Sequence, residues 1–320
     1  MALPNHDLTA RGEGSAGDVL GTYLRAQATA FLRGLRLHEE WGGGADAAEG
    51  GDAARSLRGA ARRISGSLST FRVVTESSWA DGLRTELVWL SSTLADEHAY
   101  AARLTRLLDA LHRLSGSPEV PAPRGAAGAL TVGSARAGAL LERQLTLART
   151  RAHSATLQAL GSSRFHAVAD AVAVLASEVP LDPVAARGRV DEVLVPLAEV
   201  AHTRLAAAVS ALPHDAGAQT YNADHDGSWH EVRRLLRVHR YARETLGEDV
   251  ARLTAAGEAL DRHRDAAEAA AASATAARTP RIAPATAYAL GVLHADQRHE
   301  VEAARSTFQV LWQPATAAAP

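Results

Sequence analysis

A basic pattern that occurs twice constrains the fold of this chain more than any other feature. Two triplets share the spacing i, i+3 and i+7 and lie 175 residues apart: Arg55, Arg58 and Arg62, and then His230, Arg233 and Arg237. Successive residues of an α-helix are about 100° apart, so each triplet falls on one helix face. The matched spacing predicts two related basic helices.

Acidic residues are scarce around both triplets. None occurs from Ala53 to Thr75, and Glu231 is the only one between Ser228 and Arg243. A row of guanidinium groups repels itself unless acids compensate it or it binds an anion. We therefore favour an anion-binding face. The alternatives are a solvated face, or arginines that pair with acids of neighbouring helices and hold the fold together.

Composition favours helices throughout. Alanine is abundant, aromatic residues make up 4% of the chain, and β-branched runs are few. The formal net charge of −2 excludes a globally basic nucleic-acid coat protein, so any polyanion site must be local. All 34 Lys+Arg positions are arginine, which can bind phosphate through a bidentate fork. The lack of cysteine excludes disulfides and thiolate metal sites.

The sequence gives no sign of membrane insertion or export. No uninterrupted apolar run approaches the ~20 residues that cross a bilayer. The N-terminal segment MALPNHDLTARGEG lacks a signal-peptide pattern. We expect a soluble, cytoplasmic protein without a membrane partner.

Apolar periodicity predicts a fully helical chain. Helices are expected over residues 16–41, 53–74, 83–114 and about 285–312. A long helical pattern also runs through LLERQLTLARTRAHSATLQAL, and a shorter one through SRFHAVADAVAVLASE. The breaks are the glycine-rich segment GGGADAAEGGD, the loop SGSPEVPAPRGAAGA and the prolines at 180 and 183.

The duplication extends beyond the basic helices. The segment VDEVLVPLAEVAHTRLAAAVSAL resembles DVLGTYLRAQATAFLRGL at an offset of 174 residues, and each directly precedes a basic helix. We expect an all-α fold of two pseudo-symmetric antiparallel bundles of about four helices each. The first repeat is predicted over 16–178 and the second over 183–313, with disordered tails at 1–15 and 314–320.

At the basic helices the sequence resembles one family in particular. Residues 229–241 read WHEVRRLLRVHRY, which resembles the motif L-H-E-x-R-K-x-x-K-R-x-R-Y of the conserved histidine α-helical domain family, CHAD. Residues 54–65, ARSLRGAARRIS, are similar to that family's V-H-x-x-R-V-x-x-R-R-x-R. The segments LVWLSSTLADEHA, EALDRHRDAA and YALGVLHADQRHEVEAARSTFQVLW extend the resemblance over nearly the whole chain.

The resemblance implies a single domain of two bundles whose basic faces meet, and a non-enzymatic role. The family is implicated in binding inorganic polyphosphate and in associating with polyphosphate granules, and we expect the same here. The implied ligand-binding residues are Arg55, Arg58, Arg62, Arg63, His230, Arg233, Arg234, Arg237 and Arg240. Arg84, Tyr241, His263 and Asp265 are expected either to support these residues or to stabilise the fold.

Several positions depart from the family pattern. Arg55 replaces the first histidine, Ser65 replaces an arginine, and Val88 stands where a basic residue is usual. The alternative is therefore a partly degenerate CHAD scaffold that binds a protein partner instead of polyphosphate. Compensated arginines beside an apolar patch would favour that alternative.

Other classes of function have little support in the sequence. No G-x-S-x-G, Walker A or H-E-x-x-H motif occurs, and His294 and His299 are spaced i, i+5 where a helical metal pair needs i, i+4. We expect no enzyme activity, cofactor or metal. Nucleic acid is a competing ligand because its phosphates would fit the same basic groove. Base reading or stacking, however, needs aromatic residues on the binding face, and we expect Trp229 and Tyr241 in the core or at its rim, so nucleic-acid binding is disfavoured.

Overall fold

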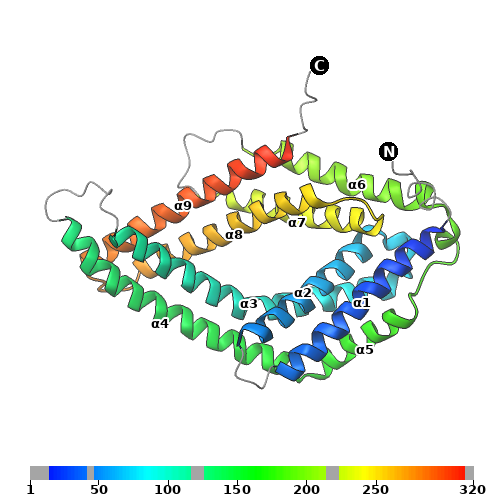
Figure 1. Cartoon of the computed structure of the whole chain (residues 1–320), viewed down its shortest axis with the longest axis horizontal. Coiled ribbons are helices and arrows are strands. Elements are labelled where there is room, and N and C mark those ends of the chain that lie inside the picture. Colours follow the sequence, from blue (N-terminus) through cyan, green and yellow to red (C-terminus); the bar gives the residue numbers. More distant parts are fainter. Residues whose placement is uncertain (1–13, 42–46, 117–125, 214–222, 314–320) are drawn as a thin grey trace, which may run out of the picture. The chain divides into compact units, whose positions relative to one another are not determined.

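The computed structural model describes residues 14–41, 47–116, 126–213 and 223–313, and these are almost entirely helical (Figure 1). The α-helices are α1 (Ala16–Trp41), α2 (Ala47–Thr70), α3 (Ser77–Gly116), α4 (Ala126–Leu160), α5 (Ser163–Ser177), α6 (Val190–Ser210), α7 (Asp226–Thr245), α8 (Ala251–Ala277) and α9 (Pro284–Trp312). Two short 3₁₀-helices, η2 (Arg72–Val74) and η3 (Ala185–Arg187), lie between them. The predicted all-α fold is confirmed, and the internal duplication stays a prediction.

Helix boundaries follow local sequence signals. Helix α1 has the predicted limits. Its start is fixed by Ser15 and Asp18, which form a reciprocal cap: each side chain accepts a hydrogen bond from the other's backbone N–H, both at 3.2 Å. Helix α2 begins before the predicted Ala53 and runs through Gly50 and Gly51, each of which lowers helix stability by about 1 kcal/mol relative to alanine. Of the predicted disordered tails, residues 1–13 and 314–320 lie outside the described residues, as do most of the predicted loops. Residues 14 and 15 are described, and Ser15 is ordered by its contacts with Asp18.

The described residues pack into two compact units, and each unit combines three chain segments. The first unit comprises residues up to Ala95 together with 154–209 and 234–250. The second comprises 96–153, 210–233 and the chain from Ala251 onward. Helices α3, α4 and α7 therefore each contribute to both units. This division concerns packing, so the predicted repeats at 16–178 and 183–313 stay a prediction about the sequence.

The core of the first unit forms where α1 packs against α2 and α5 (Figure 1). Leu24, Phe31 and Ile64 are fully buried members of this core. The chain entering α1 is held by a hydrogen bond from the N–H of Ala16 to the carbonyl of Gly188, at 2.8 Å. These contacts fix α2, which carries the first basic row, against the rest of the unit.

The core of the second unit forms along the pair α8 and α9, which lie side by side (Figure 1). Small residues such as Ala269 and Ala276 face Leu290 and Leu293 in this core. Gly133 of α4 also belongs here, because a Cβ at that position would lie 2.1 Å from a backbone oxygen of α9. Close approach of helices thus depends on small side chains in this unit.

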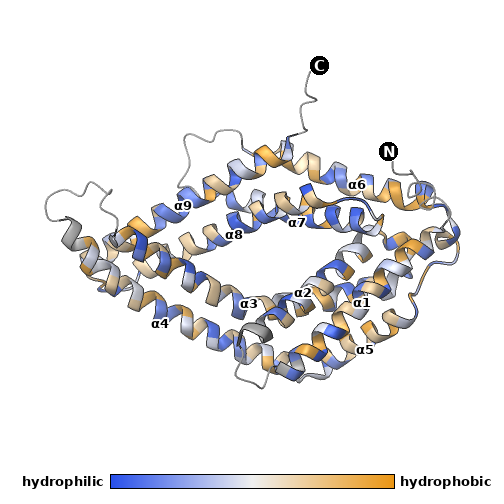
Figure 2. Ribbon diagram, viewed as in Figure 1, coloured by the Kyte–Doolittle hydropathy of each residue, from blue (hydrophilic) through white to orange (hydrophobic). Residues whose placement is uncertain are grey.

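Helix α6 is the most apolar helix of the first unit, and Figure 2 shows it as largely hydrophobic. Among the described residues it is the one helix whose length and composition would allow it to cross a membrane. It passes this test although charged residues such as Glu199 and Arg204 interrupt it. Core helices of soluble proteins pass the same test, and Leu194 and Ala198 of α6 are buried in the first unit. The finding is weak evidence for a membrane span.

Candidate anion-binding surface

The first basic row lies along α2 in the first unit. Arg55 is exposed and pairs with Asp52 one turn earlier, with 2.5 Å between nitrogen and oxygen. Arg58 and Arg62 are half-buried and lie one turn apart. Arg62 has no hydrogen-bonding or acidic partner among the described residues, although its Nε atom is buried. Arg62 is therefore a cation whose charge no carboxylate of the described chain compensates.

Arg63 and Arg240 share one carboxylate, that of Glu244. The Nε atom of Arg63 donates to Oε2 of Glu244 at 2.8 Å, and Nε of Arg240 lies 3.3 Å from Oε1. The hydroxyl of Tyr23 donates to the same Oε2 atom at 3.0 Å. Burial and the adjacent Glu244 carboxylate raise the pKa of Tyr23, so its hydroxyl stays a donor. All these groups belong to the first unit.

The ring of Tyr241 sets the distance between α2 and this part of α7. A Cβ on Gly66 would lie 2.6 Å from a ring carbon of Tyr241, so only glycine leaves room for the ring. The guanidinium carbons of Arg63 and Arg240 lie 5.6 Å and 5.2 Å from the centre of the same ring, within the range of a cation–π contact. Tyr241 is buried, as expected for a core residue, and it supports two of the predicted ligand-binding arginines.

In the second unit, Arg233 pairs with an acidic residue of a neighbouring helix, which is the structural alternative to ligand binding. Its Nε atom donates to Asp261 of α8, and its side chain is only 13% exposed. Burial lowers the pKa of Arg233, and the Asp261 carboxylate counteracts the shift. The neighbouring His230 is half-buried, and burial lowers its pKa, so its protonation requires a pH further below 6.5 than an exposed histidine needs.

His263 and Asp265 lie on α8 in different surroundings. His263 is fully buried, with its ring stacked on Trp229 at 5.6 Å between ring centres. Asp265 is exposed and pairs with the adjacent Arg264 at 2.5 Å. Trp229 is buried as expected. His263 thus belongs to the core of the second unit, and Asp265 to its surface.

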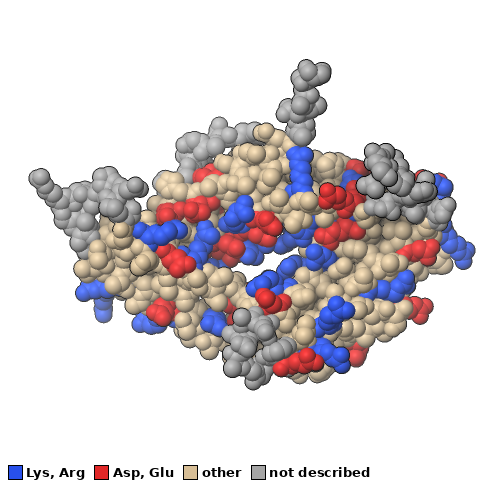
Figure 3. Space-filling view, viewed as in Figure 1, with Lys and Arg blue, Asp and Glu red and all other residues tan. Residues whose placement is uncertain are grey.

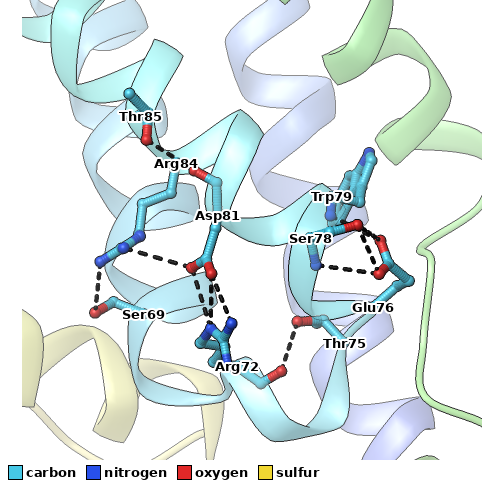
Figure 4. Close-up of polar contacts among 9 residues, drawn as sticks. All are labelled: Ser69, Arg72, Thr75, Glu76, Ser78, Trp79, Asp81, Arg84 and Thr85. Carbon is cyan, nitrogen blue, oxygen red and sulfur yellow. Dashed lines mark hydrogen bonds and ion pairs between the residues drawn. The ribbon is translucent and has the colours of Figure 1, made fainter.

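Arg84 belongs to a separate ion-pair group where α2 leads into α3 (Figure 4). Asp81 accepts three hydrogen bonds from Nε and Nη2 of Arg72, the shortest at 2.7 Å, and lies 3.4 Å from Nη2 of Arg84. Arg84 also approaches the hydroxyl of Ser69 at 3.5 Å. These contacts tie the end of α2 to α3, so Arg84 has a structural role here.

The acidic partners are the functional residues that the sequence did not reveal. Glu244 follows Arg240 at i+4, a spacing from which an ion pair between the two could have been predicted. The contact between Arg63 and Glu244 spans 181 residues, and Asp261 lies on another helix from Arg233. Figure 3 shows the consequence on the visible face, where arginines and acidic residues are interspersed. No group of three or more His, Asp or Glu among the described residues could hold a metal ion.

The two basic helices, α2 and α7, can be compared with those of known protein families. The family model of the CHAD domain matches residues 26–274 of the chain. The chain belongs to the CHAD domain family. Both basic helices lie inside the matched region, so the predicted family is confirmed.

Solved structures agree with this assignment. PptA from Streptomyces chartreusis is 59% identical to this CHAD protein, with a TM-score of 0.80, and the match covers 94% of this chain and 100% of PptA. The crystal structure of the CHAD domain from the plant Ricinus communis has a TM-score of 0.59 at 19% identity, with 93% of each chain covered, and shows the common fold alone. A comparison with curated proteins gave no match.

Proposed function

We propose that this CHAD protein binds inorganic polyphosphate, without catalysis, on the arginine-rich surface of α2 and α7. Family membership supports the class of ligand. The observation that carries the proposal is Arg62, a half-buried arginine without any partner among the described residues. A guanidinium group in this state retains its charge and its donors for a phosphate oxygen.

The spacing of the basic residues suits a polymer. Arg58 and Arg62 lie one turn apart on α2, about 6 Å along the helix axis. A linear chain of phosphates carries one negative charge per unit and can contact such a row at several points. Each contact releases condensed counterions, so the affinity should fall steeply as salt rises. We expect Arg62 to contribute more than Arg233, since Arg233 is paired with Asp261.

Calorimetric titration tests this function. Long-chain polyphosphate should bind at low salt and more weakly at physiological salt. Double-stranded DNA and inorganic monophosphate are the matched polyanion and single-unit controls. Binding to polyphosphate that exceeds binding to both controls would support the proposal. Absence of polyphosphate binding even at low salt would refute it.

A protein-binding scaffold is the second candidate function, and two observations favour it. Several arginines of the basic rows have acidic partners, Arg63 and Arg233 among them. In the first unit, Val73 and Val184 are 56% and 79% exposed, and the segments that carry them are joined by a β-bridge between Thr75 and Leu181. The combination of compensated arginines with exposed apolar residues suits a protein partner. If polyphosphate does not bind in the titration described above, that result would favour this candidate.

A further inference from the structure

Glu244 places a negative charge inside the basic surface of the first unit. We propose that Glu244 is a specificity-determining residue of the polyphosphate site. It holds Arg63 and Arg240 in place and cancels one of their two charges, so that only a ligand with several linked phosphates binds well. This inference rests on the proposed function, and it assigns a role to a residue outside the two basic rows.

The contacts show how Glu244 leaves the arginines available. Its carboxylate contacts the Nε edge of each guanidinium group, at 2.8 Å for Arg63 and 3.3 Å for Arg240. The Nη atoms of Arg63 and Arg240 have no hydrogen-bond partner among the described residues. A phosphate can therefore approach the Nη side while the carboxylate stays in place.

Exposure agrees with this role. The side chains of Arg63, Arg240 and Glu244 are 34%, 17% and 16% exposed, so the cluster is neither sealed in the core nor fully solvated. Tyr23 also fixes the carboxylate, because its hydroxyl donates to Oε2 at 3.0 Å. The ring of Tyr241 contacts both guanidinium groups. The carboxylate is thus held where it reduces the attraction of the pair for any anion.

Electrostatics gives the expected size of the effect. The Glu244 carboxylate lies 2.8 Å from Nε of Arg63 and 3.3 Å from Nε of Arg240. It therefore repels a phosphate bound to these guanidinium groups at short range, where the local dielectric is lower than that of water. Removing its charge while keeping its shape should tighten binding roughly tenfold at low salt. The salt dependence should also steepen by about 0.7, the value for one additional charge contact with a single-stranded polyanion.

The test compares Glu244→Gln with Glu248→Gln in the full chain. Both variants remove one negative charge from neighbouring parts of the chain, but Glu248 pairs with Arg243, at 3.0 Å, and with neither basic row. We expect Glu244→Gln to bind long-chain polyphosphate about tenfold more tightly than the natural chain, and Glu248→Gln to stay within about twofold. Equal affinities for the two variants would overturn the inference.

The outcomes separate this inference from the proposed function. If the natural chain binds and the two variants match, the function stands and the role of Glu244 fails. If neither the natural chain nor Glu244→Gln binds, both fail. If only Glu244→Gln binds, the role of Glu244 is supported and the natural chain is not a polyphosphate binder.

A double-mutant cycle shows whether Glu244 acts through its arginines. The gain from Glu244→Gln should disappear when Arg63→Gln and Arg240→Gln are also present, a result that a purely structural role would not produce. If Glu244→Gln does not fold, Glu244→Ala decides, because it removes the same charge without adding an amide. We expect it to bind polyphosphate about tenfold more tightly than Glu248→Ala, and equal affinities would overturn the proposal.

Discussion

Asp226 in the first turn of α7 accepts hydrogen bonds from both terminal nitrogens of Arg298 in α9. Nη1 lies 2.6 Å from Oδ2, and Nη2 lies 3.2 Å from Oδ1. Arg305 adds a third bond to the same carboxylate at 2.7 Å, while His263 lies 3.7 Å away, too far for a hydrogen bond. Arg298 is fully buried, so this cluster fixes the start of the second basic helix within the second unit.

We expect Asp226→Asn to destabilise the protein by about 3–5 kcal/mol, because it removes the charge of the carboxylate that pairs with the buried Arg298 and with Arg305. Urea unfolding followed by circular dichroism measures the loss. Asp265→Asn is the matched control, since its exposed pair with Arg264 should contribute less than about 1 kcal/mol. Similar losses in the two variants would contradict the assignment.

The same carboxylate predicts a loss of stability in acid. Burial alone would raise the pKa of Asp226. The contacts of Asp226 with His263 and Arg298 nevertheless hold this pKa at about 2, below the ordinary 3.8. A folded-state pKa below the unfolded value gives stability that is present above pH 3.8 and is lost as pH falls toward 2. Measured free energies of unfolding should decline over this range in the natural chain and less steeply in Asp226→Asn.

A histidine pair in the first unit predicts a second loss at higher pH. The rings of His202 in α6 and His239 in α7 lie 5.0 Å apart between centres. Burial lowers the pKa of His239 to about 4, and the charges of Arg243 and His202 add to this effect, while Glu199 opposes it.

As the pH falls, His239 becomes protonated in the unfolded chain before it does so in the folded protein. The free energy of unfolding is therefore highest above pH 6.5 and falls by up to about 3 kcal/mol as the pH drops toward 4. His239→Gln should flatten the free energy of unfolding between pH 7 and pH 5. His153→Gln, which changes an exposed histidine beside Glu97, should leave that pH dependence unaltered. An identical pH profile for all three proteins would disprove the assignment.

Gly66 predicts a packing effect at the contact of α2 with α7. Gly66→Ala should destabilise the protein by about 1–3 kcal/mol, since its Cβ would lie 2.6 Å from the Tyr241 ring. Gly82→Ala in α3 is the control, because no atom lies within 4 Å of its Cβ position. It should stabilise the protein by about 0.5–1 kcal/mol through the higher helix propensity of alanine. Thermal unfolding measures both changes in stability, and a Gly66→Ala variant as stable as Gly82→Ala would contradict the predicted clash with Tyr241.

The first basic row predicts the response of polyphosphate binding to charge removal. Arg58→Ala/Arg62→Ala should weaken binding at least about tenfold at low salt and reduce the salt slope by about 1.4, or 0.7 for each contact. Arg189→Ala, which removes an exposed charge paired with Asp191 outside both rows, should stay within about twofold. Arg233→Ala is a poorer probe because it also breaks the pair with Asp261. Unchanged affinity in the double variant would exclude α2 from the site.

The sequence by itself determined the helical fold, the family and the two basic rows. Those features depend on local periodicity and spacing, which each helix carries within its own residues. It also determined the start of α1, because Ser15 and Asp18 form a cap within one turn.

Only the tertiary structure decided which arginines of the basic rows have acidic partners. Arg62 has no partner among the described residues, whereas Arg63 is bound to Glu244, 181 residues away, and Arg233 to Asp261 on another helix. Ion pairs between helices depend on how the helices pack and on which small residues, such as Gly66, allow close contact. No periodicity within one helix records that information.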